Sequence, residues 1–318
     1  RMTSIGRVIF VDSVHQILWE RLIKMNWECF DKTHLNSSDI SPILNQYEGI
    51  VIRSKIKLTA EILSKCKNLK FIARAGSGLE NIDLDFCSKN NIHVFSSPEG
   101  NRDAVAEHAM GMLLMLNNHL KRVDQQVREG VWIRAENRGF ELKGKTIALI
   151  GYGVMANAFA QRLKGFDVTV IAYDKFKTNF SDEFVKEATL EEIYAKADVL
   201  SIHTNYHANN KYLVNHQLIQ SFKKPFILIN TARGFNVNTT DLVNGLKSKK
   251  SIGACLDVLE YESVSFETVP DVDSSEALRY LGKAENVIFS PHIAGWTHES
   301  HFKLSNVLAD KIQHWVAN

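Results

Sequence analysis

The chain has few cysteines, and they show no paired arrangement. Cys29, Cys66, Cys87 and Cys255 are the only four in 318 residues, and none belongs to a C-x-x-C motif. A disulfide framework or a zinc site would need a regular pairing of such residues. We therefore expect free thiols, as is usual in the reducing cytoplasm, and we assign no metal to the chain.

Long hydrophobic runs and an excess of one charge are also missing. No apolar run approaches the roughly 18 residues that a membrane span needs, and the amino end has no signal-peptide pattern. The 38 basic and 36 acidic side chains nearly balance, with a formal net charge of +2. Because this balance gives no reason to expect binding to nucleic acid or an anionic membrane, we predict a cytoplasmic protein with neither partner.

The first third of the chain alternates between short apolar segments and helical periods. Strands are predicted at about 7–11, 49–53 and 70–74, with helices at about 14–25 and 60–66 between them. This alternation is typical of a parallel sheet covered by helices. A chain of 318 residues also exceeds the usual size of one domain, so we expect two.

A long helix and a second alternating series follow. The helix is predicted from Asn101, as its N-cap, to about Gly130, and its apolar stripe indicates core or a subunit interface. The six strands after it fit a doubly wound dinucleotide-binding domain. An amphipathic helix at 298–317 ends the chain. The predicted strands are 146–150, 168–173, 199–203, 226–230, 253–256 and 287–289, the helices are 156–163, 190–195 and 240–248, and a surface loop with a short helix spans 261–283.

A glycine turn follows the first of these six strands. The segment IALIGYGVMANAF (147–159) has two glycines of a G-x-G-x-x-G pattern, with Ala156 at the third position. Gly151 suits a tight turn, Gly153 lets the backbone approach a pyrophosphate, and the helix from Val154 presents its amino end to phosphate. Alanine is tolerated at the third position, which requires only close packing of helix on strand. Strand, turn and helix in this order predict a dinucleotide site.

An acid ends the next strand, at Asp174 in VTVIAYD (168–174). A carboxylate at this position accepts hydrogen bonds from ribose hydroxyls and repels a 2′-phosphate. We therefore expect NAD rather than NADP, although Lys175 and Lys177 weaken that preference. A methyltransferase that binds S-adenosylmethionine also uses a glycine turn and a ribose-binding acid, so this pattern alone leaves that alternative open.

Functional side chains follow the later strands. Arg233 comes after ILIN and His292 after VIF, and the acids Asp257, Glu260 and Glu262 come after the intervening strand GACL. Ligands of α/β sheets lie beyond the carboxyl ends of the strands, so we expect these side chains to converge. An arginine can hold a substrate carboxylate, a histidine can exchange a proton as hydride moves, and a carboxylate can orient that histidine. This set predicts interconversion of 2-oxo and 2-hydroxy acids rather than methyl transfer.

Six segments together resemble the D-isomer-specific 2-hydroxyacid dehydrogenases. They occur in the order and spacing of that family and span nearly the whole chain. The segments are ARAGSGLENID (73–83), GNRDAVAEHAMGMLL (100–114), LKGKTIALIGYG (142–153), INTARG (229–234), GACLDVLEYE (253–262) and SPHIAG (290–295).

The resemblance implies a role for each member of the catalytic set. Arg233 matches the substrate-binding arginine and His292 the general acid/base. Glu262, rather than Glu260, matches the acid that partners the histidine. Ser263 stands where the family usually has proline, and the loop after it is longer than usual.

The resemblance also implies the fold and the cofactor contacts. It indicates two Rossmann-like, doubly wound parallel-sheet domains with the active-site cleft between them. Residues 1–100 and 296–318 would form a discontinuous substrate domain, and 101–295 the NAD-binding domain. Asp257 is expected near the nicotinamide amide, and Asn205 replaces a common proline. The implied cofactor-binding residues are Ser77, Gly151, Gly153, Val154, Met155, Asp174, Thr204, Thr231, Ala232 and Asp257.

Within the family, the resemblance is greatest to the phosphoglycerate dehydrogenases, which act on 3-phosphoglycerate and 3-phosphohydroxypyruvate. Arg53, Arg74 and Arg134 match positions that bind the substrate phosphate, the last from the neighbouring subunit, and Gly76 belongs to the same substrate-binding set. Clustered guanidinium groups suit a dianionic phosphate. We therefore predict NAD-dependent oxidation of 3-phosphoglycerate, at the head of serine biosynthesis.

Other readings stay open. The same chemistry could serve glyoxylate, hydroxypyruvate or another D-2-hydroxy acid, and some members of the family are dinucleotide-sensing corepressors. The family implies a homodimer, with the helix after Asn101 as its interface. Longer phosphoglycerate dehydrogenases carry a carboxyl-terminal regulatory domain; this chain stops at residue 318, so we expect no serine feedback through such a domain.

Overall fold

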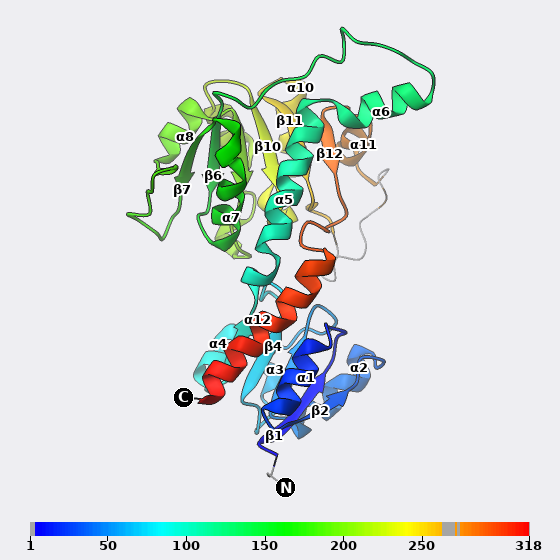
Figure 1. The fold of residues 1–318 in the computed structure, drawn as a ribbon, viewed down its shortest axis with the longest axis vertical. Coiled ribbons are helices and arrows are strands. Elements are labelled where there is room, and N and C mark those ends of the chain that lie inside the picture. Colours follow the sequence, from blue (N-terminus) through cyan, green and yellow to red (C-terminus); the bar gives the residue numbers. More distant parts are fainter. Residues whose placement is uncertain (1–3, 263–270, 272–273, 318) are drawn as a thin grey trace. The chain divides into compact units, whose positions relative to one another are not determined.

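The computed structural model describes residues 4–262, 271 and 274–317, which divide into two compact units. Unit 1 consists of Arg1–Asn101 and Trp296–Asn318, and unit 2 of Arg102–Gly295. Each unit is a parallel sheet with helices on both faces (Figure 1), so the predicted fold class is confirmed. In the described part of the chain, no helix is long and apolar enough to cross a bilayer.

Unit 1 is built on a five-stranded sheet in the order β2-β1-β3-β4-β5. All neighbouring strands are parallel, so their carboxyl ends share one edge of the sheet. The strands are β1 (Gly6–Phe10), β2 (Trp27–Asp31), β3 (Gly49–Ile52), β4 (Phe71–Arg74) and β5 (His93–Ser96).

Two helices from opposite ends of the chain cover one face of this sheet. Leu18 and Leu22 of α1 (Ile17–Lys24) are buried in the same cluster as Leu308 and Ile312 of α12 (His298–Ala317). The other face is covered by α2 (Ser37–Ile40), η1 (Ser41–Gln46), α3 (Ala60–Leu63) and α4 (Leu84–Lys89). The last helix of the chain therefore completes the core of the first unit.

Unit 2 is built on a seven-stranded parallel sheet in the order β12-β11-β10-β9-β6-β7-β8. The order reverses between β6 and β9, which is the switch point at which α/β sheets bind ligands. The strands are β6 (Thr146–Ile150), β7 (Thr169–Tyr173), β8 (Val185–Glu187), β9 (Val199–Ile202), β10 (Phe226–Asn230), β11 (Ser251–Leu256) and β12 (Val287–Phe289).

Helices form a layer on each face of this second sheet. One layer contains α5 (Pro98–Asn117) and α7 (Val154–Leu163), and η2 (Lys164–Phe166) follows α7. The opposite layer contains α8 (Leu190–Lys196), α9 (His216–Ser221), α10 (Thr239–Lys247) and α11 (Glu276–Lys283). Short turns at η3 (Ala208–Asn210) and η4 (Gly234–Asn236) connect strands to helices.

The long helix differs from its predicted form. It begins at Pro98, so Asn101 lies inside α5 rather than at its N-cap, and the Asn101 side chain accepts a hydrogen bond from Ser77 Oγ (2.9 Å). It ends at Asn117, because His119 adopts a left-handed conformation (φ 54°) before α6 (Leu120–Arg128). The apolar stripe that includes Met110 lies in the core of unit 2.

Three strands, β2, β5 and β8, were not predicted. Each of the three is the outermost strand at one edge of its sheet, and its side chains are largely half-buried or exposed. Their sequences therefore lack the continuous apolar run that marks a central strand. The short helix expected within 261–283 is α11, whereas residues 263–270 and 272–273 of that predicted loop lie outside the described residues.

Candidate active site

The turn after β6 has the geometry that a bound phosphate requires. Gly153 is the N-cap of α7, and Val154 and Met155 form the first turn of that helix. Gly151 has φ +88°, and a Cβ at this position would lie 2.6 Å from the carbonyl oxygen of His203, so glycine is required. A Cβ on Gly153 would meet no described atom within 4 Å. An anion can therefore approach the amino end of α7, whose first N–H groups have no partners within the helix.

Asp174 is fixed at the end of β7 by main-chain hydrogen bonds. Its Oδ2 accepts from Tyr152 N (2.8 Å), and its Oδ1 accepts from Phe176 N (2.9 Å) and Lys177 N (3.0 Å). Burial raises the pKa of this carboxyl, but the three N–H bonds and the charge of Lys177 outweigh burial and bring the pKa below its usual value. A fixed carboxylate at this position suits a ribose diol and repels a 2′-phosphate.

Two buried threonine hydroxyls lie just beyond the ends of β9 and β10. Thr204 follows β9 and Thr231 follows β10, and neither Oγ1 has a hydrogen-bond partner among the described residues. A buried polar group left unpaired costs about 1–3 kcal/mol, so each hydroxyl is suited to a ligand that supplies a partner. The adjacent strands β7, β6, β9 and β10 thus end in an acid, an open glycine turn and two hydroxyls, which fit NAD. The described ranges contain no group of three or more His, Cys, Asp or Glu side chains that could hold a metal ion.

We predict that Asp174→Ala raises KM for NAD about tenfold and reduces the preference for NAD over NADP, because a hydrogen bond to a charged group contributes about 1.5–3 kcal/mol. The measurement is kcat/KM with each cofactor. Asp182→Ala is a matched control, since Asp182 also accepts main-chain N–H bonds, from Phe184 (2.8 Å) and Val185 (2.6 Å), but lies in an exposed turn. An unchanged ratio of the two kcat/KM values in Asp174→Ala would contradict the assignment.

The turn that carries Arg233 is held by the buried side chain of Asn230. Asn230 is 0% exposed at the end of β10; its Oδ1 accepts from Ala232 N (3.1 Å) and its Nδ2 donates to Arg233 O (2.9 Å). The Arg233 guanidinium donates to Ala232 O (2.8 Å). A guanidinium presents its N–H donors in a fork that matches a carboxylate, so this turn places a suitable group at the edge of the sheet.

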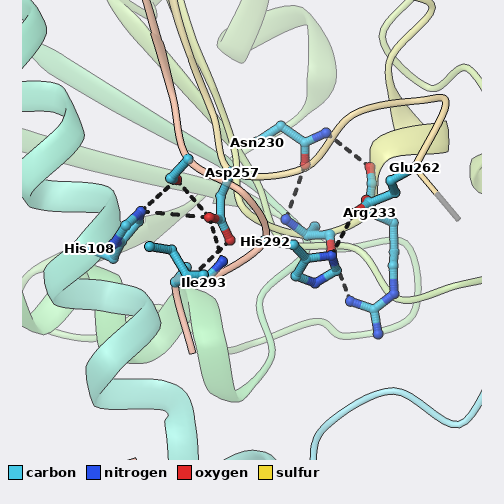
Figure 2. Close-up of polar contacts among 10 residues, drawn as sticks. His108, Asn230, Arg233, Asp257, Glu262, His292 and Ile293 are labelled. Atoms are coloured by element: carbon cyan, nitrogen blue, oxygen red, sulfur yellow. Dashed lines mark hydrogen bonds and ion pairs between the residues drawn. The ribbon is translucent and has the colours of Figure 1, made fainter. Parts of the chain in front are cut away.

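Glu262 and His292 form a hydrogen-bonded pair (Figure 2). Glu262 Oε2 lies 2.7 Å from His292 Nδ1, and the side chains are only 10% and 21% exposed. An ionised carboxylate can only accept, so Nδ1 carries the proton in this bond and Nε2 is the nitrogen that can exchange a proton with a ligand. Arg233, Glu262 and His292 follow the neighbouring parallel strands β10, β11 and β12 and lie at the same edge of the sheet.

Glu260, the other acid weighed from the sequence, has a different environment. Its Oε1 accepts from Tyr212 Oη (2.6 Å), and its Oε2 accepts from Thr239 N (2.9 Å) at the start of α10. The hydrogen bond to this carboxylate raises the pKa of Tyr212 to about 12. Gly234 passes so close to this segment that a Cβ would overlap the carbonyl of Leu259. Glu260 therefore links the segments that carry Tyr212 and Thr239, whereas Glu262 is the acid bonded to His292.

Asp257 holds the loop on which His292 lies. His292 has φ 55°, a left-handed conformation that costs a non-glycine residue roughly 1–2 kcal/mol. The Asp257 carboxylate accepts from Ser290 Oγ (2.6 Å), Ile293 N (2.9 Å) and Ala294 N (3.0 Å), and its main-chain oxygen accepts from His292 N (2.7 Å). Its side chain is 1% exposed. Asp257 thus acts on His292 through the loop, and its proximity to a nicotinamide stays a prediction.

Three supporting residues were missed from the sequence: Asn230, Ser290 and His108. His108, on α5, has its Nε2 2.7 Å from Ser290 Oγ, and the Ser290 hydroxyl in turn donates to Asp257. In Figure 2, His108 and Asp257 lie on one side of His292, and Glu262 and Arg233 on the other. In the sequence, Asn230 is marked only as a polar residue of the buried strand ILIN, and Ser290 only as a neighbour of His292 in SPHIAG.

The predicted substrate residues of unit 1 gather at the carboxyl ends of β3 and β4. Arg53 N donates to Asp12 Oδ2 (2.5 Å), and the Arg53 guanidinium lies 4.8 Å from the centroid of the Trp296 ring. Arg74 ends β4, and its side chain lies so close to Gly76 that a Cβ there would overlap the guanidinium. Arg134 lies in unit 2, on the exposed segment that follows α6. Ser77, predicted as a cofactor residue, belongs to unit 1.

Comparison with known proteins identifies relatives of both units. Residues 110–294 match the family model described as D-isomer specific 2-hydroxyacid dehydrogenase, NAD binding domain. The chain is 34% identical over 290 residues to a hydroxypyruvate reductase of Thermotoga maritima, covering 91% of this chain and 92% of that one. It is 32% identical over 308 residues to a D-3-phosphoglycerate dehydrogenase of Archaeoglobus fulgidus, covering 96% of this chain but only 56% of the relative.

A solved structure shares the whole fold. The D-lactate dehydrogenase of Aquifex aeolicus, crystallised with NAD and lactic acid, superposes with a TM-score of 0.80 at 28% identity. The match covers 98% of this chain and 95% of that one. The chain thus spans nearly the full length of some relatives and about half the length of the phosphoglycerate dehydrogenases it matches.

Proposed function

The chain belongs to the D-isomer-specific 2-hydroxyacid dehydrogenases, which use NAD, and we propose that it interconverts 3-phosphoglycerate and 3-phosphohydroxypyruvate, at the head of serine biosynthesis. Unit 2 binds NAD and unit 1 binds the substrate phosphate in this proposal. The observation that carries the chemistry is the Glu262–His292 hydrogen bond at the strand edge that also bears Arg233.

Each residue of this set has one task in the proposed reaction. The glycine turn after β6 and Asp174 would hold NAD, which would supply the hydride acceptor for C2 of the hydroxy acid. The Nε2 atom of His292 takes the hydroxyl proton, because its Nδ1–H is engaged by Glu262. Glu262 keeps the ring oriented and stabilises the positive charge that the ring gains. Arg233 binds the substrate carboxylate with its fork of N–H donors and so orients C2.

The choice of a phosphorylated substrate rests on Arg53 and Arg74. Arg53 directly follows β3 and Arg74 is the last residue of the neighbouring parallel strand β4, so their main chains lie at one edge of the sheet. Guanidinium groups bind phosphate through charge-assisted hydrogen bonds, whereas glyoxylate or lactate offers no such group at the far end.

We expect Arg53→Ala and Arg74→Ala each to raise KM for 3-phosphohydroxypyruvate about 10- to 100-fold, since a charged hydrogen bond contributes about 1.5–3 kcal/mol. KM for hydroxypyruvate should stay within about twofold of wild type. Steady-state kinetics with NADH and a panel of 2-oxo acids provides both values. Arg7→Ala is the control, because Arg7 lies near the amino end of β1 and packs on Phe30 and Tyr47.

The hydroxypyruvate reductase relative favours a second candidate, the reduction of hydroxypyruvate or glyoxylate. Equal kcat/KM for phosphorylated and unphosphorylated substrates, with no effect of the arginine variants, would favour it. A dinucleotide-sensing protein without turnover would instead bind NADH and reduce no member of the panel. The presence of Arg233, Glu262 and His292 together argues for turnover.

We also propose a homodimer, in which Arg134 reaches the substrate of the other copy. The support is a group of exposed apolar side chains on α6 and the segment after it, which extends away from the sheet of unit 2 (Figure 1). Trp132 is 79% exposed and Phe140 67% exposed. A second copy of the chain would remove this apolar surface from water.

A further inference from the structure

A cluster of histidines in unit 1 adjoins Arg53 and has no part in the hydride transfer described above. We define the histidine cluster as His15, before α1, and His298 and His301, in the first turn of α12. The His15 and His301 ring centroids are 5.3 Å apart at an interplanar angle of 69°. Residues from the start and the end of unit 1 thus lie together, near enough to Arg53 for its charge to act on His301.

The His15 ring is held in one orientation. Its Nδ1 accepts a hydrogen bond from Ile17 N (3.2 Å). The main-chain N–H of His15 donates to Ser305 Oγ (3.2 Å), and the ring packs edge-on against Phe302 (5.2 Å). Both contacts tie His15 to α12, the helix that carries His301.

Positive charge acts on His301 from the loop before α1, from the residue after β3 and from α12 itself. Burial, followed by the charges of His15, Arg53 and His298, lowers the pKa of His301. The carboxylate of Asp12, on the loop after β1, already accepts the main-chain N–H groups of Arg53 (2.5 Å) and Lys55 (3.3 Å).

Two further charged groups lie on the segments that carry Arg53 and His301. The Lys55 ammonium donates to the carbonyls of Val11 (2.8 Å) and Thr33 (2.5 Å). Glu299, next to His298 on α12, is exposed. The amino end of α12, a helix that runs to Ala317, adds further positive potential. The cationic form of His301 is therefore disfavoured until an anion binds beside it.

We propose that His301, together with His15 and Arg53, binds the distal phosphate of the substrate and takes up a proton as it does so. This inference rests on the proposed function, because it concerns the same phosphate, and it makes His301 a residue that selects phosphorylated over unphosphorylated 2-oxo acids. A dianion beside the ring favours the imidazolium form, which adds a charge-assisted donor to those of Arg53.

The sign of the pH dependence follows from this coupling. The anion raises the pKa of His301 above its value in the free protein, so binding is strongest at low pH and weakens as pH rises through the value in the complex. Above about pH 7 the phosphate ester is already largely dianionic, since its second pKa is about 6. A loss of affinity above that pH therefore reports on the protein rather than on the ligand.

The first test is His301→Gln, which keeps a polar side chain but cannot become charged. We expect KM for 3-phosphohydroxypyruvate to rise about tenfold at pH 7 and little at pH 9, with kcat and the KM for hydroxypyruvate within about twofold of wild type. His34→Gln, at an exposed position of the same unit, is the control and should change neither KM. An unchanged KM for the phosphorylated substrate at pH 7 would overturn the proposal.

The second test needs no turnover. NMR titration of the histidine ring signals of the full chain with NAD, with and without inorganic phosphate, should show the pKa of His301 rising by about two units, the signal being assigned from its loss in His301→Gln. Absence of that rise overturns the anion site. If it occurs while 3-phosphohydroxypyruvate is not reduced, the anion site stands and the proposed substrate is wrong. Reduction of that substrate with no rise and no effect of His301→Gln leaves the proposed function standing and the anion site wrong.

Discussion

His292→Ala is expected to lower kcat by about 10²- to 10⁴-fold, because the substrate hydroxyl would lose its proton acceptor as hydride leaves C2. NADH binding should be unchanged, since His292 is bonded to Glu262 and to the loop around Asp257 rather than to the glycine turn. Steady-state rates and a fluorescence titration with NADH measure the two effects separately.

Glu262→Gln tests the same hydrogen-bonded pair with a smaller chemical change. The amide keeps the shape of the side chain and can accept the Nδ1–H bond, but it cannot stabilise the charged ring, so we expect a smaller loss of kcat than in His292→Ala. A loss of less than about tenfold in His292→Ala would show that another group moves the proton, and the assignment of His292 would fail.

Asp257→Ala is expected to lower the free energy of unfolding by about 3–5 kcal/mol. The variant leaves the Ser290 hydroxyl and the N–H groups of Ile293 and Ala294 without their acceptor in a buried place, and each unpaired group costs about 1–3 kcal/mol before relaxation. Urea unfolding followed by circular dichroism gives the value. kcat should fall as well, because the strained conformation of His292 loses its support.

Asp124→Ala is the control for this prediction. Asp124 is exposed and pairs with Arg128 of the same helix (2.7 Å), so its loss should leave the urea midpoint nearly unchanged. If Asp257→Ala unfolds at the same urea concentration as wild type, the carboxylate does not hold the loop, and the account of how His292 is positioned is wrong.

The central strands could be predicted because both of their faces are buried. IALI and GACL are apolar throughout and ILIN is apolar up to Asn230, and in a parallel sheet such a run identifies a strand without any knowledge of its neighbours. WECFD and VKE could not be identified in this way, since one side of an edge strand faces solvent and its polar residues resemble those of a loop.

A similar division applies to the candidate site. The position of Arg233, Glu262 and His292 after successive strands indicated that they would share one edge of a sheet, and the family resemblance indicated Glu262 as the partner of His292. It could not indicate that His108 reaches Ser290, because this contact joins positions 182 residues apart and depends on the angle at which α5 packs on the sheet. The histidine cluster is of the same kind, since His15 and His301 meet only because α12 packs beside α1.

The discontinuous composition of unit 1 has a consequence for the synthesis of the protein. Unit 2 is a single stretch of chain, so all of its residues are available once Gly295 has left the ribosome. The sheet of unit 1 is made first, but Leu308, Ala309 and Ile312, which close one side of its core, are made after unit 2. One apolar face of the first sheet therefore stays uncovered while unit 2 is being made. During that interval a chaperone has the most apolar surface of unit 1 to bind.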